Sequence, residues 1–559
     1  MSDPIKNIRC LIVVLLALVL GAHAGLAAML APSRADVPSA TEQIAPLLSG
    51  MGKHTFEVTT GSQRAQQFFN QGINLAYGFN HAEAGRSFRE AARLDPEMAM
   101  AYWGQALVLG PNINMPMDAA DEPKALELIE KAQALKAKAS EREQGYIEAL
   151  ATRYSGKAEE RAERDRAYAE AMKKLSQSYP HDLDAATLYA EALMDLRPWN
   201  YWTRDGRPYP GTPEAIAVLE SVMERNPEHP GANHFYIHLL EPADPPRAEA
   251  AADRLRFLVP DAGHLVHMPA HIYLRVGRYA DASAANDRAI AADESYLSQC
   301  RAQGIYPLGY YPHNIHFLWS SSTMEGRSKV ALEAAGKVVE QIPAQAASEM
   351  PLLQTFLVIP DYALTRFGHW EEVLQQPAPD EDKPFLAGIR HYARGLAFAA
   401  LGKLGEAEIE LAYLKKIAAE PALAELILFS PNNAADVLAI AVEVLAGDLA
   451  AKRQDYPRAI SHLERGVRLE DGLAYIEPPD WHYPVRQALG AVLLEAGIAR
   501  EAETVYWEDL QRNRENGWSL FGLVQALRAQ GKTEQAAEVE KRFNKAWERA
   551  DVQLSASRF

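Results

Sequence analysis

Apolar residues recur at helical spacing in two neighbouring stretches near the start of the repetitive part of the chain. Residues 66–79 and 81–94 place apolar side chains three and four positions apart, with polar residues between them. A period of about 3.6 residues is typical of an α-helix that buries one face. Asn80 interrupts the pattern and Asp95-Pro96 ends it, because proline cannot continue a helix. The pattern therefore predicts a helix-turn-helix hairpin, with helices over Gln66–Phe79 and His81–Leu94.

Small and aromatic residues mark the place where these two helices would cross. Counting from Ala65, the first helix has an aromatic, a small and an apolar residue at Phe68, Gly72 and Leu75. The second helix has its packing residues at Ala84, Phe88 and Ala91. With these residues the stretch resembles the tetratricopeptide repeat, a helix-turn-helix unit of about 34 residues. One hairpin cannot bury its own apolar face, so the resemblance implies stacked neighbours.

Similar hairpins recur along the rest of the chain. Proline terminators stand at Pro227, Pro260 and Pro343. Turns that begin with glycine lie at residues 277–279, 368–370, 402–404 and 531–533. A repeat of this length predicts roughly ten units, several of them degenerate, over residues 61–559. The resemblance implies an all-α superhelix, or α-solenoid, and is nearly silent on activity, because one fold hosts many unrelated functions.

The first residues of the chain differ from the repeats. Lys6 and Arg9 precede an apolar run, and small residues follow it up to Ala24. This order predicts a secretory signal peptide over residues 1–24. An uncleaved anchor is the alternative, but the run is shorter than the about 20 residues that span a bilayer. We therefore expect a periplasmic or secreted protein, with no membrane segment after cleavage and with residues 25–60 as a flexible tether.

Composition limits the classes of partner and of chemistry. The 559 residues carry a formal net charge of -17, which argues against a nucleic-acid partner because such binding depends on Lys and Arg. Cys300 would be alone after cleavage, so we expect no internal disulfide and interpret this thiol as a small buried apolar residue. The sequence contains no phosphate-binding glycine loop, nucleotide fingerprint, HExxH motif or GxSxG elbow.

Histidine is concentrated in the middle of the chain. Eight of the sixteen histidines lie between His229 and His316. After the first, they form three groups: His234 and His238, followed by Glu241; His264, His267 and His271; His313 and His316. Their spacings of three, four and seven place each group along one stripe of a helix, with neighbouring β-carbons about 5–6 Å apart. Two imidazoles on adjacent turns can therefore bind one ion.

The three groups share a register within the repeats. In units that start at residues 230, 263 and 312, one position of the first helix is taken by His234, His267 and His316. A second position is taken by His238 and His271, and a third by His264 and His313. The resemblance implies that these positions face the inner, concave surface, where such proteins hold their ligands. We therefore expect seven histidines of the central units, residues 230–345, to line one groove.

A shared cation explains why so many imidazoles are gathered, since closely packed imidazoles cannot all be protonated. We predict that the first ligands are His234, His238, His267 and His271, with Glu241 able to complete a two-histidine, one-carboxylate site. A second group, which binds a second ion or orients the first ligands, comprises His264, His313 and His316. Copper, zinc and iron all suit imidazole. The alternatives are a metal-free polar groove for a peptide or small anion, pH sensing, and incidental packing.

Two irregular segments interrupt the repeats. Residues 196–212 are too long for a turn between helices and include Trp199 and Trp202, and residues 477–484 read EPPDWHYP. Long loops in a compact array are usually functional or disordered, and the aromatic content argues against disorder. An aromatic lid over a pocket and a packing plug both fit. Further candidates for contact with a bound molecule are Arg275 and Tyr310.

Two residues near the histidine groups bear on their geometry. Pro269 lies inside the first helix of its unit, where it removes a backbone donor, so we expect a kink in that helix. Asn114 either caps a helix or faces the groove.

Two functions fit these observations. The first is an exported metalloenzyme, oxidative or hydrolytic, whose metal ion keeps open coordination positions beneath an aromatic loop. The second is a periplasmic scaffold that binds a peptide or protein partner, or delivers a metal, without catalysis. Both place a small molecule or peptide in the concave groove. A vacant coordination position beside a pocket favours the first, and an open groove without a lid favours the second.

Overall fold

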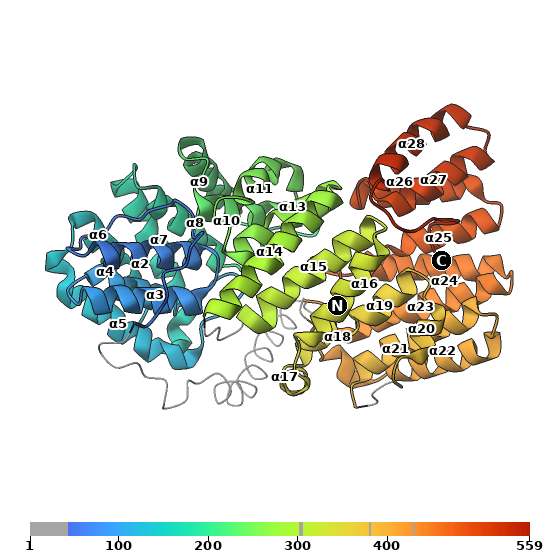
Figure 1. The fold of residues 1–559 in the computed structure, drawn as a ribbon, viewed down its shortest axis with the longest axis horizontal. Helices are drawn as coiled ribbons and strands as arrows, with labels where there is room; N and C mark the ends of the chain where they lie inside the picture. Colours follow the sequence, from blue (N-terminus) through green and yellow to red (C-terminus); the bar gives the residue numbers. More distant parts are fainter. Residues whose placement is uncertain (1–42, 301–305, 379–381, 429–430) are drawn as a thin grey trace, which may run out of the picture. The chain divides into compact units, whose positions relative to one another are not determined.

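The computed structural model describes residues 43–300, 306–378, 382–428 and 431–559. Within these ranges the protein is built from α-helices and short turns of 3₁₀ or π helix, and no strand is longer than an isolated bridge (Figure 1). The predicted all-α class is therefore confirmed. The predicted signal peptide and residues 25–42 of the predicted tether lie outside the described residues. No helix in the described ranges is both long and apolar enough to cross a membrane.

The helices fall into two compact units, Pro38–Asn314, called the first unit, and Ile315–Phe559, called the second unit. The first unit contains α2 (Gln63–Tyr77), α3 (His81–Leu94), α4 (Ala99–Leu107), α5 (Glu122–Leu135), α6 (Glu141–Ala151), α7 (Arg161–Ser178), α8 (Leu183–Asp195), α9 (Thr212–Arg225), α10 (Pro230–Leu240), α11 (Glu249–Leu255), α12 (Gly263–His267), α13 (Pro269–Val276) and α14 (Tyr279–Gln299). The next helix, α15 (Tyr311–Met324), begins at the end of the first unit and continues into the second.

The second unit is also built from helices, which differ widely in length. It contains α16 (Ser328–Glu340), α17 (Ala344–Glu349), α18 (Gln354–Leu357), α19 (Ile359–Arg366), α20 (Trp370–Gln375), α21 (Pro384–Ala400), α22 (Leu404–Ala418), α23 (Ala434–Lys452), α24 (Tyr456–Glu470), α25 (Val485–Glu495), α26 (Ala499–Arg512), α27 (Gly517–Ala529) and α28 (Thr533–Ala546). Successive helices pack against each other in pairs, as α21 with α22 and α23 with α24.

The hairpin of α2 and α3 shows why the repeats form. The side chains of Ser62 and Asn80 cap the two helices, and each accepts a hydrogen bond from a backbone N–H three residues further on. A β-carbon on Gly72 would lie 2.5 Å from the ring of Phe88, so only a glycine lets the helices cross this closely. The tetratricopeptide-type hairpin predicted here is therefore confirmed, with α2 beginning and ending slightly earlier than expected.

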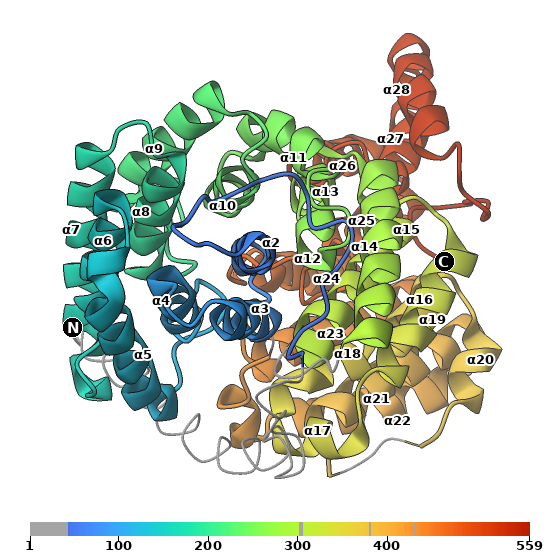
Figure 2. The ribbon, with the colours of Figure 1, turned by 60° about the vertical axis from the view of Figure 1, so that its left-hand side comes forward.

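The hairpins of the first unit curve round so that α10 packs against α2 (Figure 2). The contact is close, because a β-carbon on Gly231 of α10 would lie 2.6 Å from the ring of Tyr77 of α2. The turn after α2 therefore lies beside the first histidine group. Phe79, predicted as the last residue of the first helix, lies outside it with a φ of 56°.

Residues 43–60, the described part of the predicted tether, pack against the first unit instead of standing free. Phe56 is buried, and its ring contacts those of Phe69, Trp103 and Tyr146. The backbone N–H of Thr59 donates to the Glu143 carboxylate at 2.6 Å. This segment therefore belongs to the packed core of the unit.

The kink predicted at Pro269 is present. α12 ends at His267 and α13 begins at Pro269, with Met268 between them. The missing N–H of the proline interrupts the helix. The break lies between His267 and His271, so it sets the angle at which these two side chains approach each other.

Candidate metal centre

Six of the seven histidines expected in one groove come together in the first unit. They form two groups, which we call the upstream triad (His234, His238 and His264) and the downstream triad (His267, His271 and His313). In each triad, one ring nitrogen of every histidine lies within 4.8 Å of the others. The residues come from α10, α12, α13 and the start of α15. The grouping differs from the predicted first ligand set, because His264 joins the upstream pair and His313 the downstream pair.

Both triads are enclosed. His313 is half-buried, and the other five histidines are between 0% and 4% exposed, so the rings do not line an open groove. Burial, and after it the neighbouring imidazoles, lowers the pKa of His234, His264 and His267 well below the ordinary value. These rings are therefore neutral at physiological pH, which is the state in which imidazole binds a metal.

The hydrogen-bond partners of His267 and His271 bear on which ring nitrogen of each histidine holds the proton. His267 Nδ1 lies 2.7 Å from Asn286 Oδ1, and Asn286 Nδ2 donates to the carbonyl of Ala282 at 2.8 Å, so the amide presents its oxygen to the ring. His271 Nδ1 lies 2.9 Å from Oε2 of the Glu241 carboxylate. His267 Nδ1 therefore donates, and its Nε2 carries a lone pair. The contact of His271 with Glu241 has the distance of an ion pair, and Oε2 of Glu241 has no hydrogen-bond partner among the described residues. The Nε2 atoms of His267 and His271 lie 3.0 Å apart, which is close enough for the two rings to share one proton or one cation.

Glu241 joins the two triads. Its side chain is fully buried, with Oε1 3.2 Å from His238 Nδ1 and Oε2 2.9 Å from His271 Nδ1. Burial alone would raise the pKa of this carboxyl, but His271 and His238 bring it down to about 2. Glu241 was predicted as a direct metal ligand. Its Oε1 contacts His238, whereas its Oε2 has no hydrogen-bond partner among the described residues, and Glu241 and His271 both offer a ligand atom to one possible metal group. Its role as a direct ligand therefore stays a prediction.

The upstream triad contains ring nitrogens without protein partners. His234 Nδ1 lies 2.6 Å from the carbonyl oxygen of Tyr77, so Nδ1 donates and Nε2 keeps its lone pair. Among the described residues, no hydrogen-bond partner faces Nε2 of His234, Nε2 of His238 or either ring nitrogen of His264. Each buried polar group left unpaired costs about 1–3 kcal/mol. Four such nitrogens in one place therefore favour a bound ligand.

Phe79 is a site residue that the sequence pattern did not predict. Its ring centroid lies 4.6, 5.9 and 5.6 Å from those of His234, His238 and His264. Its φ of 56° falls in the left-handed region, which few residues other than glycine adopt. The turn after α2 thus holds an apolar wall against the upstream triad. The one signal for this in the sequence is the position of Phe79 next to the turn residue Asn80.

Trp199 and Tyr310 cover the upstream triad. The Trp199 ring meets His238 edge-on with centroids 5.1 Å apart, and the Tyr310 ring meets His264 at 4.7 Å. Asn114 joins the two, because its Oδ1 accepts from Trp199 Nε1 at 3.1 Å and its Nδ2 donates to Tyr310 Oη at 3.3 Å. Trp199 is 38% exposed, so these three residues, which we call the lid, lie between the triad and solvent. Asn114 therefore faces the site, and it caps none of the described helices.

Three other predicted residues belong to neither triad. His316 belongs to the second unit, where it stacks on Trp319 and meets Phe356 edge-on, and burial lowers its pKa to about 3. Trp202 donates from Nε1 to the carbonyl of Leu239 at 2.6 Å, as a packing plug would. Arg275 donates to a backbone carbonyl at 3.4 Å. The segment 196–212 therefore combines both expectations, a lid at Trp199 and a plug at Trp202.

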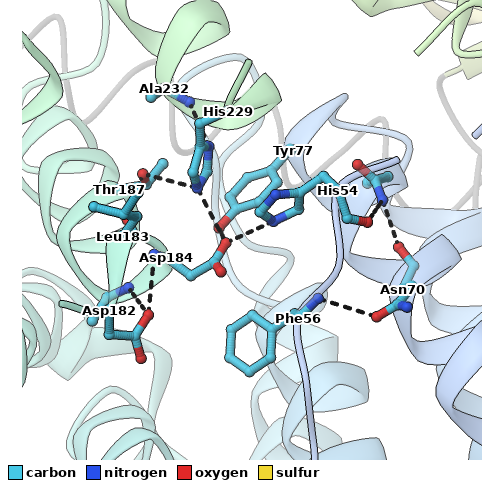
Figure 3. A network of polar contacts seen from close by, with 12 residues as sticks. His54, Phe56, Asn70, Tyr77, Asp182, Leu183, Asp184, Thr187, His229 and Ala232 are labelled. Carbon is cyan, nitrogen blue, oxygen red and sulfur yellow. Dashed lines mark hydrogen bonds and ion pairs between the residues drawn. The ribbon is translucent and has the colours of Figure 1, made fainter. Parts of the chain in front are cut away.

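A third group of close titratable residues lies in the same unit. Asp184 Oδ1 lies 2.9 Å from His54 Nε2 and 3.2 Å from His229 Nε2, and it accepts the hydroxyl of Tyr77 at 2.6 Å (Figure 3). His229 Nδ1 accepts the backbone N–H of Ala232 at 3.2 Å, so the proton of this ring is on Nε2. His229 therefore donates to Asp184, and the group is a hydrogen-bond network, not a ligand set. Sequence spacing did not predict it, because its members come from distant segments.

Comparisons with known proteins add little to these contacts. No family model matches the sequence, and no curated protein matches it either. Human IFIT1, solved as a dimer with m7Gppp-AAAA, is 12% identical over 87% of this chain and 91% of that chain, with a TM-score of 0.30. Yeast Tom70 is 12% identical over 86% of this chain and 96% of that chain, with a TM-score of 0.29. Likenesses this weak carry no argument, so the fold and the site rest on the residues described above.

Proposed function

We propose that the protein binds two d-block metal ions, one at each histidine triad. The observation that carries this proposal is the 3.0 Å separation of the Nε2 atoms of His267 and His271. Histidine nitrogens lie about 2.0–2.1 Å from zinc, so two nitrogens that share an ion lie about 3 Å or slightly more apart. The spacing suits two ligands of one ion. A proton held by His271 and shared with His267 is the alternative, and elemental analysis distinguishes the two.

The anchoring of the rings supports the same proposal. Histidines that bind metals usually donate their second ring N–H to a carboxylate, a carbonyl or a similar acceptor, which holds the tautomer and the ring orientation. Three histidines of the triads have such a hydrogen-bond partner at Nδ1: His234, His238 and His267. Each of these three rings is thus held in the form that binds through Nε2.

Charge balance supports it as well. Glu241 is an ionised carboxylate in a fully buried position, and its ion-pair partners within the described residues are imidazoles, not Lys or Arg. A buried charge is stable only when it is paired. Divalent ions bound by the triads would supply further positive charge beside this carboxylate.

The number of protein ligands favours catalysis over a purely structural role. Structural zinc sites usually take four protein ligands, whereas catalytic sites take three and leave a position for water or substrate. Each triad offers three imidazoles, and the lid over the upstream triad is the place where a small substrate would enter. Each triad consists of imidazoles alone, which suits zinc or copper, and iron would need Glu241 as a carboxylate ligand. Zinc implies hydrolytic chemistry, and copper implies oxidative chemistry.

Elemental analysis of the untagged, full-length protein tests the proposal. We expect two ions per chain, and a melting temperature that rises with added metal, by the equivalent of about 2.7 kcal/mol at a hundredfold excess over Kd. The double variant His238→Ala, His271→Ala removes one ligand from each triad and should lose both the metal and the rise in melting temperature. The matched control is His462→Ala, because His462 lies in the second unit and contacts Glu443 at 2.6 Å.

The scaffold alternative makes the opposite prediction. A repeat protein that only binds a peptide or protein partner has no tight metal, and its melting is insensitive to zinc and copper. Wild-type protein that is purified without metal, and that melts at the same temperature as the double variant with and without these ions, would overturn the metal proposal and favour the scaffold.

A further inference from the structure

The second unit contains a small cavity that the metal proposal does not use. About 40 Å³ of it is open to the centres of water molecules. Helices α19, α21 and α23 and the irregular segment 477–484 line it, and its ionisable side chains include Arg366, Asp448, Lys452, His482, Tyr483 and Arg558. A site of about 10–15 Å³ already holds one water molecule. The cavity therefore has room for a few water molecules or for one small anion.

Arg366 is the unusual residue of this cavity. It is 4% exposed, and no carboxylate of the described residues forms an ion pair with it. Two other buried arginines of this unit each contact one, Arg390 with Asp361 and Arg486 with Asp471. A buried cation without an acidic partner is costly, whereas a buried pair with good hydrogen bonds is tolerated. A bound anion would therefore stabilise the buried charge of Arg366.

Two aromatic rings stack on the Arg366 guanidinium, but neither supplies a full negative charge. The Arg366 guanidinium lies 3.5 Å from the ring centroid of Trp518 and 4.8 Å from that of Tyr483, and one of its amino groups donates to Gln487 Oε1. Its Nε has no hydrogen-bond partner among the described residues. Burial lowers the pKa of this guanidinium to about 9, and the opposing effect of Tyr483, Asp509 and Tyr392 is smaller than that of burial. The stacked rings fix the plane of the guanidinium and leave its donors for another group.

A second group of the cavity adds positive charge. Lys452 is exposed at its edge, and the carboxylate of Asp448 is already engaged by Arg558. His482 is nine-tenths buried, and its Nε2 lies 3.3 Å from the Tyr392 hydroxyl. His482 Nδ1 has no hydrogen-bond partner in the described part of the chain. An anion in the cavity would meet two cationic groups, Arg366 and Lys452.

We propose that this cavity binds one small oxyanion, a carboxylate or phosphate group, with Arg366 as its principal donor. The planar guanidinium fork matches the two oxygens of such a group. Lys452 contributes charge at the entrance. The inference is independent of the metal centre, because every residue that carries it belongs to the second unit.

Thermal unfolding of the full-length protein tests this inference, with inorganic phosphate and acetate as probes and chloride at the same ionic strength as reference. We expect one or both oxyanions to raise the melting temperature saturably, and the stronger of the two identifies the geometry of the bound group. Arg366→Met should weaken the oxyanion by about tenfold or more, since it loses charge-assisted hydrogen bonds. Arg486→Met, which removes a paired arginine outside the cavity, should leave the oxyanion effect unchanged.

Two further variants keep the test decisive. Lys452→Met changes an exposed residue, so it should fold, and it should weaken the oxyanion several-fold. The double variant His238→Ala, His271→Ala should keep the full oxyanion effect, which separates this cavity from an anion bound to a metal. The inference is overturned if neither oxyanion acts beyond chloride, or if the effect survives both Arg366→Met and Lys452→Met.

Discussion

Two groups of buried histidines in the first unit look alike by distance and differ in their protons. The downstream triad and the network of His54, Asp184 and His229 both bring three possible ligand atoms within 4.8 Å of each other. In the triad, the Nδ1 atoms of His267 and His271 face acceptors, and their Nε2 atoms face each other. In the network, His229 Nδ1 accepts a backbone N–H and its Nε2 donates to Asp184.

The difference teaches that the partner of the second ring nitrogen decides what a buried histidine can do. A ring whose Nδ1 donates has a lone pair at Nε2 for a metal. A ring whose Nδ1 accepts has a proton at Nε2 and can only donate there. Proximity alone would assign a metal to both groups. The tautomers assign it to the triad and leave the network as a structural tie between residues 43–60, α2, α8 and α10.

The largest expected effect comes from one substitution in each group. His267→Asn removes the Nε2 atom that faces His271, and we expect at least the downstream ion to be lost. His229→Asn keeps a side-chain acceptor at the N-terminus of α10, so we expect the metal content to stay at the wild-type value. Elemental analysis after dialysis measures both. An equal loss of metal in the two variants would contradict the assignment of the metal to the triad and not to the network.

Asp184→Ala should have the next largest effect, on stability and not on metal. The substitution leaves the donors of His54, His229 and Tyr77 unpaired, and breaking a buried pair in this way costs about 3–5 kcal/mol. Urea unfolding measures the cost. The folded fraction should keep its full metal content, and a variant that also lost its metal would show that the network and the triads are one site.

The same carboxylate predicts how stability depends on acid. Burial alone would raise the pKa of Asp184, but the hydrogen bonds from His229 and His54 hold it well below the usual range. The folded pKa thus lies below the unfolded value of about 3.9, so the stabilisation is present above that pH and is lost as the pH falls below it. Urea midpoints between about pH 2 and 6 should therefore drop more steeply for wild type than for Asp184→Asn. Parallel curves would contradict the assignment.

Glu241→Gln should weaken metal binding without abolishing it. The amide keeps an acceptor for one histidine but loses the charge and the second acceptor, and such losses near a metal ligand typically cost about 10–100-fold in affinity. Competition with a chelator measures the change. Glu443→Gln is the matched control, since Glu443 contacts His462 Nδ1 in the second unit, and its metal affinity should equal that of wild type.

Trp199→Phe should have the smallest effect on stability, at most about 1 kcal/mol, because it removes one partly exposed hydrogen bond to Asn114. If the lid limits access to the upstream triad, metal should pass to a chelator faster in this variant at an unchanged total content. Trp507→Phe is the control, because Trp507 is also 38% exposed and lies in α26. Identical release rates in the two variants would argue against a lid.

Short-range sequence patterns were sufficient to predict the repeats, but not the residues that surround the histidines. The hairpin of α2 and α3 follows from turn residues, capping residues and the glycine at the crossing, all of which act within about one repeat. Asn114, Phe79 and His54 could not be placed in this way. Their partners come from distant parts of the chain, and neither the left-handed turn at Phe79 nor the packing of residues 43–60 has a periodic signal.

The helical repeats and the stripes of histidine can be predicted from local spacing, because a spacing of three or four residues already selects one face of a helix. How the stripes combine depends on contacts between segments that are far apart in the chain. The return of α10 to α2 and the break at Pro269 set His264 with the upstream pair and His313 with the downstream pair, whereas His316, in the same register, lies in the second unit. The tautomers of His234 and His267 depend on such contacts too, since an acceptor from another segment reaches the second nitrogen of each ring.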